Sequence, residues 1–287
     1  DLFEEGKTIF SFEVFPPKKE SGIETVYDTI EKLTDLKPDF ISVTYGAGGS
    51  GVTNPITKDI CSKIKNEYKL ETIAHLSCIN NTKDEIDKIL EELKKEGIDN
   101  ILALRGDRVE GLEPKKDFTY ASDLTKYIMD KGGFHVSGAC YPEVHMEAKD
   151  AVDDIKNLKK KVDAGADHLI SQLFFDNRVF YDFLERARIA DINVPIEAGI
   201  MPVTSKSQIE RMVTMCGASI PASLSRIMQR YESNPEALRD AGIAYAINQI
   251  IDLAANGVDG VHIYTMNNPY VARKITEGVE SVVKHNR

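Results

Sequence analysis

Glu13 is the residue of this sequence whose position most strongly suggests chemistry, because it interrupts an otherwise almost wholly apolar run at residues 9–15. Buried glutamates are rare, and burial favours the protonated form of a carboxyl group. A protonated carboxyl near neutral pH can serve as a general acid. A structural glutamate paired with a lysine or an arginine is the alternative. The rarity of such residues favours the catalytic interpretation.

A second polar group, Arg105-Gly106-Asp107, directly follows the apolar residues 102–104. Glycine lets a ligand approach the backbone, a guanidinium can fork onto a polar group, and a carboxylate can accept a hydrogen bond from a ring nitrogen. An ordinary Arg–Asp pair at the start of a loop explains this segment equally well when it is taken alone.

The glycine-rich segment at residues 46–51 matches the pattern G-x-G-x-x-G but not its structural context. A dinucleotide fingerprint needs a helix that opens within the motif and an acid at the end of the next strand. Here the helix is expected to open later, at Asn54-Pro55, and Glu71 begins the next strand. We therefore predict a mobile glycine loop over a pocket.

Candidate metal ligands occur without the spacing of a known zinc site. They are His75 with Cys78, and Cys140 with Glu143, His145 and Glu147. No metal site is predicted. The remaining strand histidines, His135, His168 and His262, are predicted to be hydrogen-bonded histidines of the core.

Apolar runs of strand length alternate with amphipathic helical patterns along the chain. The strands are predicted at residues 8–15, 40–44, 72–76, 100–104, 134–139, 168–173, 194–200 and 260–264. The helices are predicted at residues 23–36, 54–64, 83–95, 121–130, 148–164 and 179–187, from 205 and from 270. The stretch 215–256 is predicted to hold two or three inserted helices, the longest starting at Asn234-Pro235 and ending at Gly257.

This repeat predicts an α/β fold, a (β/α)8 barrel with extra helices before strand eight, as a single domain over residues 1–287. An open doubly wound sheet is less favoured because the units are evenly spaced without a linker. Active sites of such barrels lie at the carboxyl ends of the strands. Mostly polar residues lie at or directly after the carboxyl end of nearly every strand: Glu13, Thr44, Tyr45, His75, Arg105, Gly106, Asp107, Tyr141, Gln172 and Tyr264. They predict a ring of side chains around one pocket.

Composition narrows the classes of partner. The net charge of -10 argues against nucleic acid or an anionic membrane surface. No apolar run approaches the ~20 residues of a membrane helix, and the acidic start is unlike a signal peptide. Four widely spaced cysteines fit a reducing compartment, so we expect a cytoplasmic protein.

Taken together, the strand-end segments resemble the methylenetetrahydrofolate reductase family, bacterial type, from about residue 10 to residue 264. The segments that carry the resemblance are residues 11–17 (SFEVFPP), 42–49 (SVTYGAGG), 75–78 (HLSC), 103–107 (ALRGD), 120–123 (YASD), 141–145 (YPEVH), 161–166 (KVDAGA), 172–176 (QLFFD) and 199–203 (GIMPV). Each segment alone is weak evidence for the family, but the presence of all of them in this order is highly specific for it.

The resemblance implies a barrel that holds a flavin, normally FAD, and reduces 5,10-methylenetetrahydrofolate by ping-pong hydride transfer from NADH or NADPH. It implies that Glu13 is the general acid and that Asp107 lies near flavin and pterin. Gln172, Gln208 and Tyr264 are assigned to the folate. The implied cofactor contacts are Thr44, Tyr45, His75, Arg105, Gly106, Asp107, Tyr120, Ala121, Tyr141, His145, Asp154, Asn157, Lys160 and Lys161.

The sequence departs from this pattern at two positions. Asn268 stands where bacterial relatives often have an arginine that could meet the acidic folate tail, and Met212 stands where some have a stacking phenylalanine. The electron donor therefore stays open between NADH, NADPH and a partner subunit, and a non-catalytic folate- or flavin-binding barrel is the alternative from another class. Whether the chain forms a homo-oligomer also stays open. Because the chain ends just after the barrel, we expect no regulatory domain like that of animal and fungal relatives.

Overall fold

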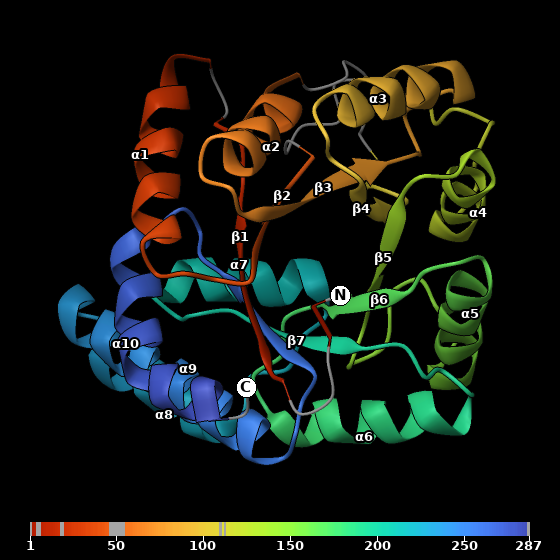
Figure 1. Cartoon of the computed structure of the whole chain (residues 1–287). Coiled ribbons are helices and arrows are strands. Elements are labelled where there is room, and N and C mark those ends of the chain that lie inside the picture. Colours follow the sequence, from red (N-terminus) through yellow and green to blue (C-terminus); the bar gives the residue numbers. More distant parts are fainter. Residues whose placement is uncertain are drawn as a thin grey trace. The chain divides into compact units, whose positions relative to one another are not determined.

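The computed structural model describes residues 2–3, 7–17, 20–45, 55–108, 111 and 113–285, in which strands and helices alternate along the chain (Figure 1). The strands are β1 (Ile9–Val14), β2 (Phe40–Val43), β3 (Glu71–Ser77), β4 (Asn100–Leu104), β5 (His135–Cys140), β6 (His168–Ser171), β7 (Ile196–Ile200) and β8 (Gly260–Tyr264). The helices are η1 (Glu20–Gly22), a single 3-10 turn, α1 (Ile23–Thr34), α2 (Pro55–Asn66), α3 (Lys83–Lys95), α4 (Ala121–Lys131), α5 (Ala151–Asp163), α6 (Asn177–Ile189), α7 (Lys206–Cys216), α8 (Ala222–Tyr231), α9 (Pro235–Ala255) and α10 (Pro269–His285).

The strands of the described residues form one closed barrel in the order β1-β2-β3-β4-β5-β6-β7-β8, and every pairing whose register is known is parallel. This arrangement confirms the predicted (β/α)8 barrel. The inserted helices before the last strand are α8 and α9. Across the described ranges, no helix has the length and apolar character needed to cross a membrane.

The chain divides into two compact units. Unit 1 comprises Asp1–Phe10, Cys140–Lys159 and Ile170–Arg287, and unit 2 comprises Ser11–Ala139 and Lys160–Leu169. The prediction of a single domain stays a prediction. The two units are described separately below.

In unit 2, the register of the strands places Glu13, Ser42, His75 and Ser137 on one face, which also carries Phe40, Ile73 and Leu102. Glu13 is aligned with Ser42, and His75 with Leu102, whose partner on β5 is Ser137. Because side chains alternate across a strand, the opposite face carries the apolar residues Phe12, Val14, Ile41, Val43, Ala74, Leu76, Ile101, Ala103 and Val136. This apolar face is the one toward the helices, since Gly138 on it meets the stem of Lys161 from α5.

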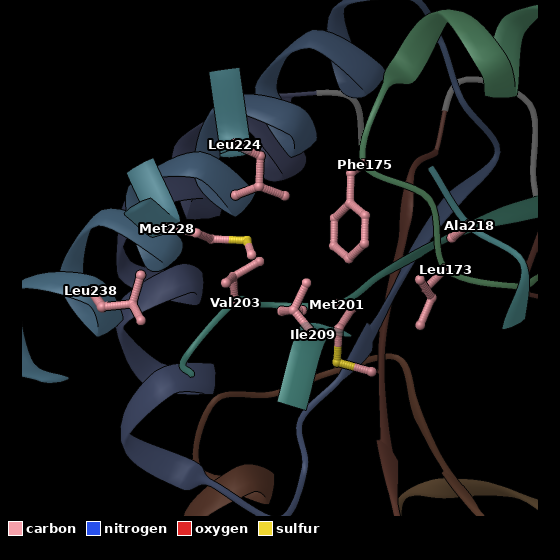
Figure 2. Packing of buried hydrophobic residues seen from close by; sticks show 9 residues of the cluster. All are labelled: Leu173, Phe175, Met201, Val203, Ile209, Ala218, Leu224, Met228 and Leu238. Atoms are coloured by element: carbon pink, nitrogen blue, oxygen red, sulfur yellow. The ribbon is translucent and has the colours of Figure 1, made fainter. Parts of the chain in front are cut away.

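In unit 1, the pair β7 and β8 likewise presents two faces. Gly199 is aligned with His262, and Glu197 with Gly260, whereas Ala198 and Ile200 on the other face are aligned with Val261 and Ile263. Beyond β7 the core continues in a cluster formed by Leu173, Phe175, Met201, Val203, Ile209, Ala218, Leu224, Met228 and Leu238 (Figure 2). Residues of α7, α8 and α9 therefore pack against the segment that follows β7.

The prediction of core histidines is confirmed in part. His168 is buried and its Nδ1 lies 2.9 Å from the hydroxyl of Ser137. His262 is fully buried. His135, however, is exposed, and its Nδ1 lies 3.1 Å from Oδ2 of Asp167. The prediction was wrong for His135 because this residue opens β5, where the strand emerges at the surface.

Candidate active site

Glu13 lies near the end of β1, and its side chain keeps 20% of its exposure. Its Oε2 lies 3.7 Å from Nε2 of His75, a buried residue of β3. A carboxyl group in this setting has little contact with water and is still reachable, which suits proton transfer to a bound molecule. The structure thus brings together two of the predicted site residues.

The Arg105-Gly106-Asp107 segment has irregular backbone directly after β4. Gly106 has a φ of +88°, and a Cβ at this position would lie 2.9 Å from Cβ of Ser77. Glycine is therefore required here both by conformation and by space. Nε of Arg105 donates to the carbonyl of Gly106 at 3.3 Å, and Asp107 is exposed. The segment presents the exposed Asp107 from a backbone fixed at Gly106.

Thr44 and Tyr45 follow β2. The N–H of Thr44 donates to the carbonyl of Val14 at 3.0 Å, and the hydroxyl of Tyr45 accepts a hydrogen bond from Nδ2 of Asn81 at 3.3 Å. Burial raises the pKa of Tyr45, and the hydrogen bond from Asn81 opposes this rise. The predicted glycine loop at residues 46–51, and the predicted helix start at Asn54, lie outside the described residues.

Tyr120 and Ala121 lie at the start of α4, in unit 2. The carboxylate of Asp123 accepts hydrogen bonds from the N–H groups of Thr119 and Tyr120, at 2.9 Å and 2.8 Å. These bonds satisfy backbone donors that a helix start leaves without intrahelical acceptors. The ring of Tyr120 is 62% exposed. It is therefore available for stacking on a planar molecule.

Four predicted cofactor contacts lie on α5. The ammonium group of Lys161 donates to the carbonyl of Ala139 on β5. Asp154 is half-buried, whereas Asn157 and Lys160 are exposed. Of the two predicted lysine contacts, Lys161 is held against the barrel strand and Lys160 extends toward solvent.

The loop with Tyr141 and His145 belongs to unit 1. The two rings pack edge to face, with centroids 4.5 Å apart. Between them Val144 has a φ of +74°, which a β-branched residue rarely adopts and which indicates backbone strain. Both carboxylate oxygens of Glu143 accept from the N–H of Ser219 at 3.0 Å. Glu143, considered above as a metal ligand, thus serves to hold this loop.

Tyr264 is bonded to the last residue of β6, Ser171, which precedes Gln172. The hydroxyl of Tyr264 donates to the carbonyl of Ser171 at 2.6 Å. A Cβ at Gly199 would lie 2.2 Å from this carbonyl oxygen and 2.7 Å from the Tyr264 hydroxyl, so glycine is required between them. The N–H of Gln172 donates to the carbonyl of Cys140 at 2.7 Å. Neither Ser171 nor Gly199 was predicted as a site residue, although a glycine within a strand pattern indicates close backbone approach.

Gln208 lies in the first turn of α7. Its Oε1 accepts from the hydroxyl of Thr204 at 3.0 Å, and its N–H donates to the hydroxyl of Ser205 at 3.2 Å. These contacts are local to the helix start. These contacts of Gln208, to Thr204 and Ser205, do not involve Ser171, Gln172 or Tyr264.

Comparison with known proteins complements this geometry. A model of the family described as "Methylenetetrahydrofolate reductase" matches residues 1–280. The chain belongs to the methylenetetrahydrofolate reductase family. It is 39% identical over 263 residues to 5,10-methylenetetrahydrofolate reductase of Escherichia coli (strain K12), which covers 92% of this chain and 88% of that protein. It is 38% identical over 279 residues to "Methylenetetrahydrofolate reductase (NADH) 1" of Arabidopsis thaliana, covering 92% of this chain and 47% of that one. The chain spans about half the length of the plant relatives that it matches.

A solved structure shares the fold. The protein comes from Clostridium thermocellum and is described as binding two copies of 5-methyl-5,6,7,8-tetrahydrofolic acid. It superposes with a TM-score of 0.65 at 17% sequence identity, covering 97% of this chain and 96% of that one. At this identity the likeness supports the barrel fold alone.

The two departures from the methylenetetrahydrofolate reductase family pattern have local structural roles. Oδ1 of Asn268 accepts from the N–H of Val271 at 3.2 Å, so this side chain satisfies the start of α10. It follows Met266 and Asn267, both in the left-handed region with φ of +52° and +53°. Met212 is partly buried and packs against the cluster of Figure 2. Asparagine at 268 thus closes the turn between β8 and α10.

Proposed function

We propose that the chain reduces 5,10-methylenetetrahydrofolate to 5-methyltetrahydrofolate, with bound FAD and with NADH or NADPH as the donor in a ping-pong sequence. Membership of the methylenetetrahydrofolate reductase family supports the reaction. The observation that carries the proposal is Glu13, a partly buried carboxyl group 3.7 Å from His75 on the face of the barrel strands that carries Ser42. The printed name of the Arabidopsis relative favours NADH as the first donor to test.

The residues present fit a flavin nucleotide. Tyr120 offers an exposed ring, Tyr45 a hydroxyl group, Asp107 a carboxylate and Lys160 an exposed ammonium group. When bound, the flavin supplies hydride transfer between the nicotinamide and the folate. In unit 2 we assign cofactor contacts to Thr44, Tyr45, His75, Arg105, Gly106, Asp107, Tyr120, Ala121, Lys160 and Lys161, and in unit 1 to Tyr141, His145, Asp154 and Asn157.

Glu13 would deliver the proton that opens the five-membered ring of the folate. The carbon–nitrogen bond to N10 breaks, its electron pair takes the proton of Glu13, and the other nitrogen stabilises the carbon as an iminium that accepts hydride. Glu13 is left as a carboxylate, and its exposed edge allows reprotonation from water. His75 lies beside this carboxyl group, with Nε2 3.7 Å from Oε2, and Asp107 would set the charge next to the flavin and the pterin.

We assign the folate to three residues of unit 1, Gln172, Gln208 and Tyr264. Their amide and hydroxyl groups can accept and donate hydrogen bonds to a pterin or to its amide-linked tail. Tyr264 is the best fixed of the three, since its hydroxyl is bonded to the carbonyl of Ser171 at 2.6 Å.

An anaerobic titration of the purified chain tests the proposal. We expect a flavin absorption band that bleaches with NADH and returns when methylenetetrahydrofolate is added, with methyltetrahydrofolate as the product. A band that stays oxidised with both NADH and NADPH would assign the donor to a partner protein. A flavin that is reduced but not reoxidised by the folate would indicate a non-catalytic barrel. Absence of flavin even after reconstitution with FAD would contradict the proposal.

Replacing Tyr264 with phenylalanine is expected to raise the KM for methylenetetrahydrofolate by about three- to tenfold, the value of one hydrogen bond. The ring then loses the bond that fixes it to Ser171, while reduction of the flavin by NADH continues unchanged. Steady-state and half-reaction kinetics measure both. Tyr245→Phe is the matched control, because its hydroxyl also donates to a carbonyl, that of Phe175, at 2.6 Å. An equal rise of the KM for methylenetetrahydrofolate in both variants would contradict the assignment of Tyr264 to the folate site.

A further inference from the structure

Residues 78–81, in the connection between β3 and α3, are more deeply buried than a surface loop. Cys78 is fully buried and Asn81 is 2% exposed, with Ile79 and Asn80 between them also buried. Buried loop backbone needs hydrogen-bond partners within the protein. We call residues 78–81 the β3–α3 turn. Besides the N–H of Lys115, which donates to the carbonyl of Ile79 at 2.8 Å, its partners include three segments of unit 2 that carry predicted cofactor contacts.

The first partner is the segment Arg105-Gly106, directly after β4. The N–H groups of Cys78 and Ile79 both donate to the carbonyl of Arg105, at 3.2 Å and 2.8 Å. A Cβ at Gly106 would lie 3.1 Å from Cγ2 of Ile79, so the two segments are fitted closely together. The β3–α3 turn therefore fixes the backbone from which Arg105 and Asp107 project.

The second partner is Tyr120. The Sγ atom of Cys78 lies 3.8 Å from the carbonyl oxygen of Tyr120, within hydrogen-bonding range for sulfur. Burial raises the pKa of Cys78 to about 12, so the group is a neutral thiol that can donate. This contact links the turn to the residue that precedes α4.

The third partner is Tyr45, reached through Asn81. Nδ2 of Asn81 donates to the carbonyl of Ser77 at 2.7 Å and to the hydroxyl of Tyr45 at 3.3 Å. Because a carbonyl can only accept, the bond to Ser77 fixes which end of the amide carries the hydrogens. The Tyr45 oxygen is then the acceptor of this pair, and its own hydrogen is directed elsewhere as a donor.

We propose that the β3–α3 turn positions the cofactor contacts of unit 2, and that Asn81 is a positioning residue that aims the hydroxyl of Tyr45 at an acceptor oxygen of the flavin nucleotide. This inference rests on the proposed function, because it needs a flavin to be bound. It adds Asn81, which is not itself assigned to the cofactor and acts through the contact residue Tyr45.

A double-mutant cycle on FAD binding tests the inference. The dissociation constant of FAD is measured by fluorescence quenching for the whole chain freed of flavin, in the wild type, Tyr45→Phe, Asn81→Ala and the double variant. We expect each single change to weaken binding by about three- to tenfold, the value of one hydrogen bond. The double variant should bind FAD no more weakly than the weaker-binding of the two single variants, because both changes remove the same hydrogen bond from Tyr45 to the flavin nucleotide.

Two readouts separate positioning from a general loss of structure. The KM for methylenetetrahydrofolate at saturating FAD should stay that of the wild type in all variants. Asn100→Ala is the matched control, since this asparagine of unit 2 also donates at 3.3 Å, to Glu71 at the start of β3; it should leave FAD affinity unchanged. If the losses of FAD affinity in the two single variants added up in the double variant, or if Asn81→Ala kept the wild-type affinity, the inference would be overturned and the proposed function would stand. A wild-type chain that binds no FAD would overturn the proposed function with it.

Discussion

Replacing Glu13 with glutamine is expected to stop the reduction of methylenetetrahydrofolate while the flavin is still reduced by NADH at close to the wild-type rate. Glutamine keeps the size of the side chain and its position 3.7 Å from His75, but it has no acidic proton to deliver. Loss of a general acid costs about 10²- to 10⁴-fold in rate. Reduction of the flavin by the nicotinamide needs no ring opening, so it should not depend on this proton.

Anaerobic stopped-flow measurement of the two half-reactions separates these outcomes. Glu71→Gln is the matched control, because Glu71 is another partly exposed carboxylate of unit 2, paired with Lys65 at 2.6 Å at the start of β3. It should lower stability and leave both half-reactions intact. Equal loss of both half-reactions in Glu13→Gln, or full folate reduction, would remove the general-acid assignment.

The alternation of apolar runs and helical patterns was sufficient to predict the barrel. Local signals placed some elements to the residue. The helix Lys83–Lys95 was predicted with its observed bounds, and Gly97, with a φ of +73°, follows its end. The structure shows a reciprocal cap between Thr82 and Glu85 at its start. The strands Asn100–Leu104 and Gly260–Tyr264 also have their predicted bounds. Such elements carry their own boundary signals in the sequence.

Other boundaries moved because side chains replaced backbone partners. The predicted strand 168–173 ends at Ser171, where the Oε1 of Gln172 accepts the N–H of Leu173 at 2.9 Å in place of a strand neighbour. The predicted helix 148–164 begins only at Ala151, because the carboxylate of Asp150 accepts the N–H of Asp153 at 2.8 Å and acts as a helix cap. Asp and Gln can bond the backbone or solvent, and the sequence pattern does not decide between them.

The candidate site was predictable as a set of strand ends but not as a set of contacts. Glu13 and His75 were expected at strand ends around one pocket, and the structure places Oε2 of Glu13 3.7 Å from Nε2 of His75. The bond between Tyr264 and Ser171 joins residues 93 positions apart, and no local pattern encodes it. Asn81 gave no signal in the sequence for the same reason, since its partner Tyr45 lies 36 positions earlier. Contacts of this kind follow from register and close packing.

Gly242→Ala is expected to cause the largest loss of stability of the substitutions considered. Helix α9 passes so close to the segment after β7 that a Cβ at Gly242 would lie 1.7 Å from the carbonyl oxygen of Val203. Neither backbone can yield without disturbing the cluster of Figure 2, to which Val203 belongs. Overpacking against backbone should cost more than about 3 kcal/mol and lower the Tm by roughly 6–12 °C, measured by circular dichroism.

Gly278→Ala on α10 is the matched control, since it makes the same change within a helix. Its added Cβ would meet Cδ1 of Ile247 at 2.5 Å, the far end of a flexible side chain that can rotate away. Replacing a helical glycine by alanine otherwise stabilises by up to about 1 kcal/mol, so the Tm should hold or rise. If both variants had the same Tm, helix propensity would decide the stability change at both sites. The argument from the close approach of α9 to Val203 would then be contradicted. A loss confined to Gly242→Ala would show that this contact fixes the segment leading from β7 to Gln208.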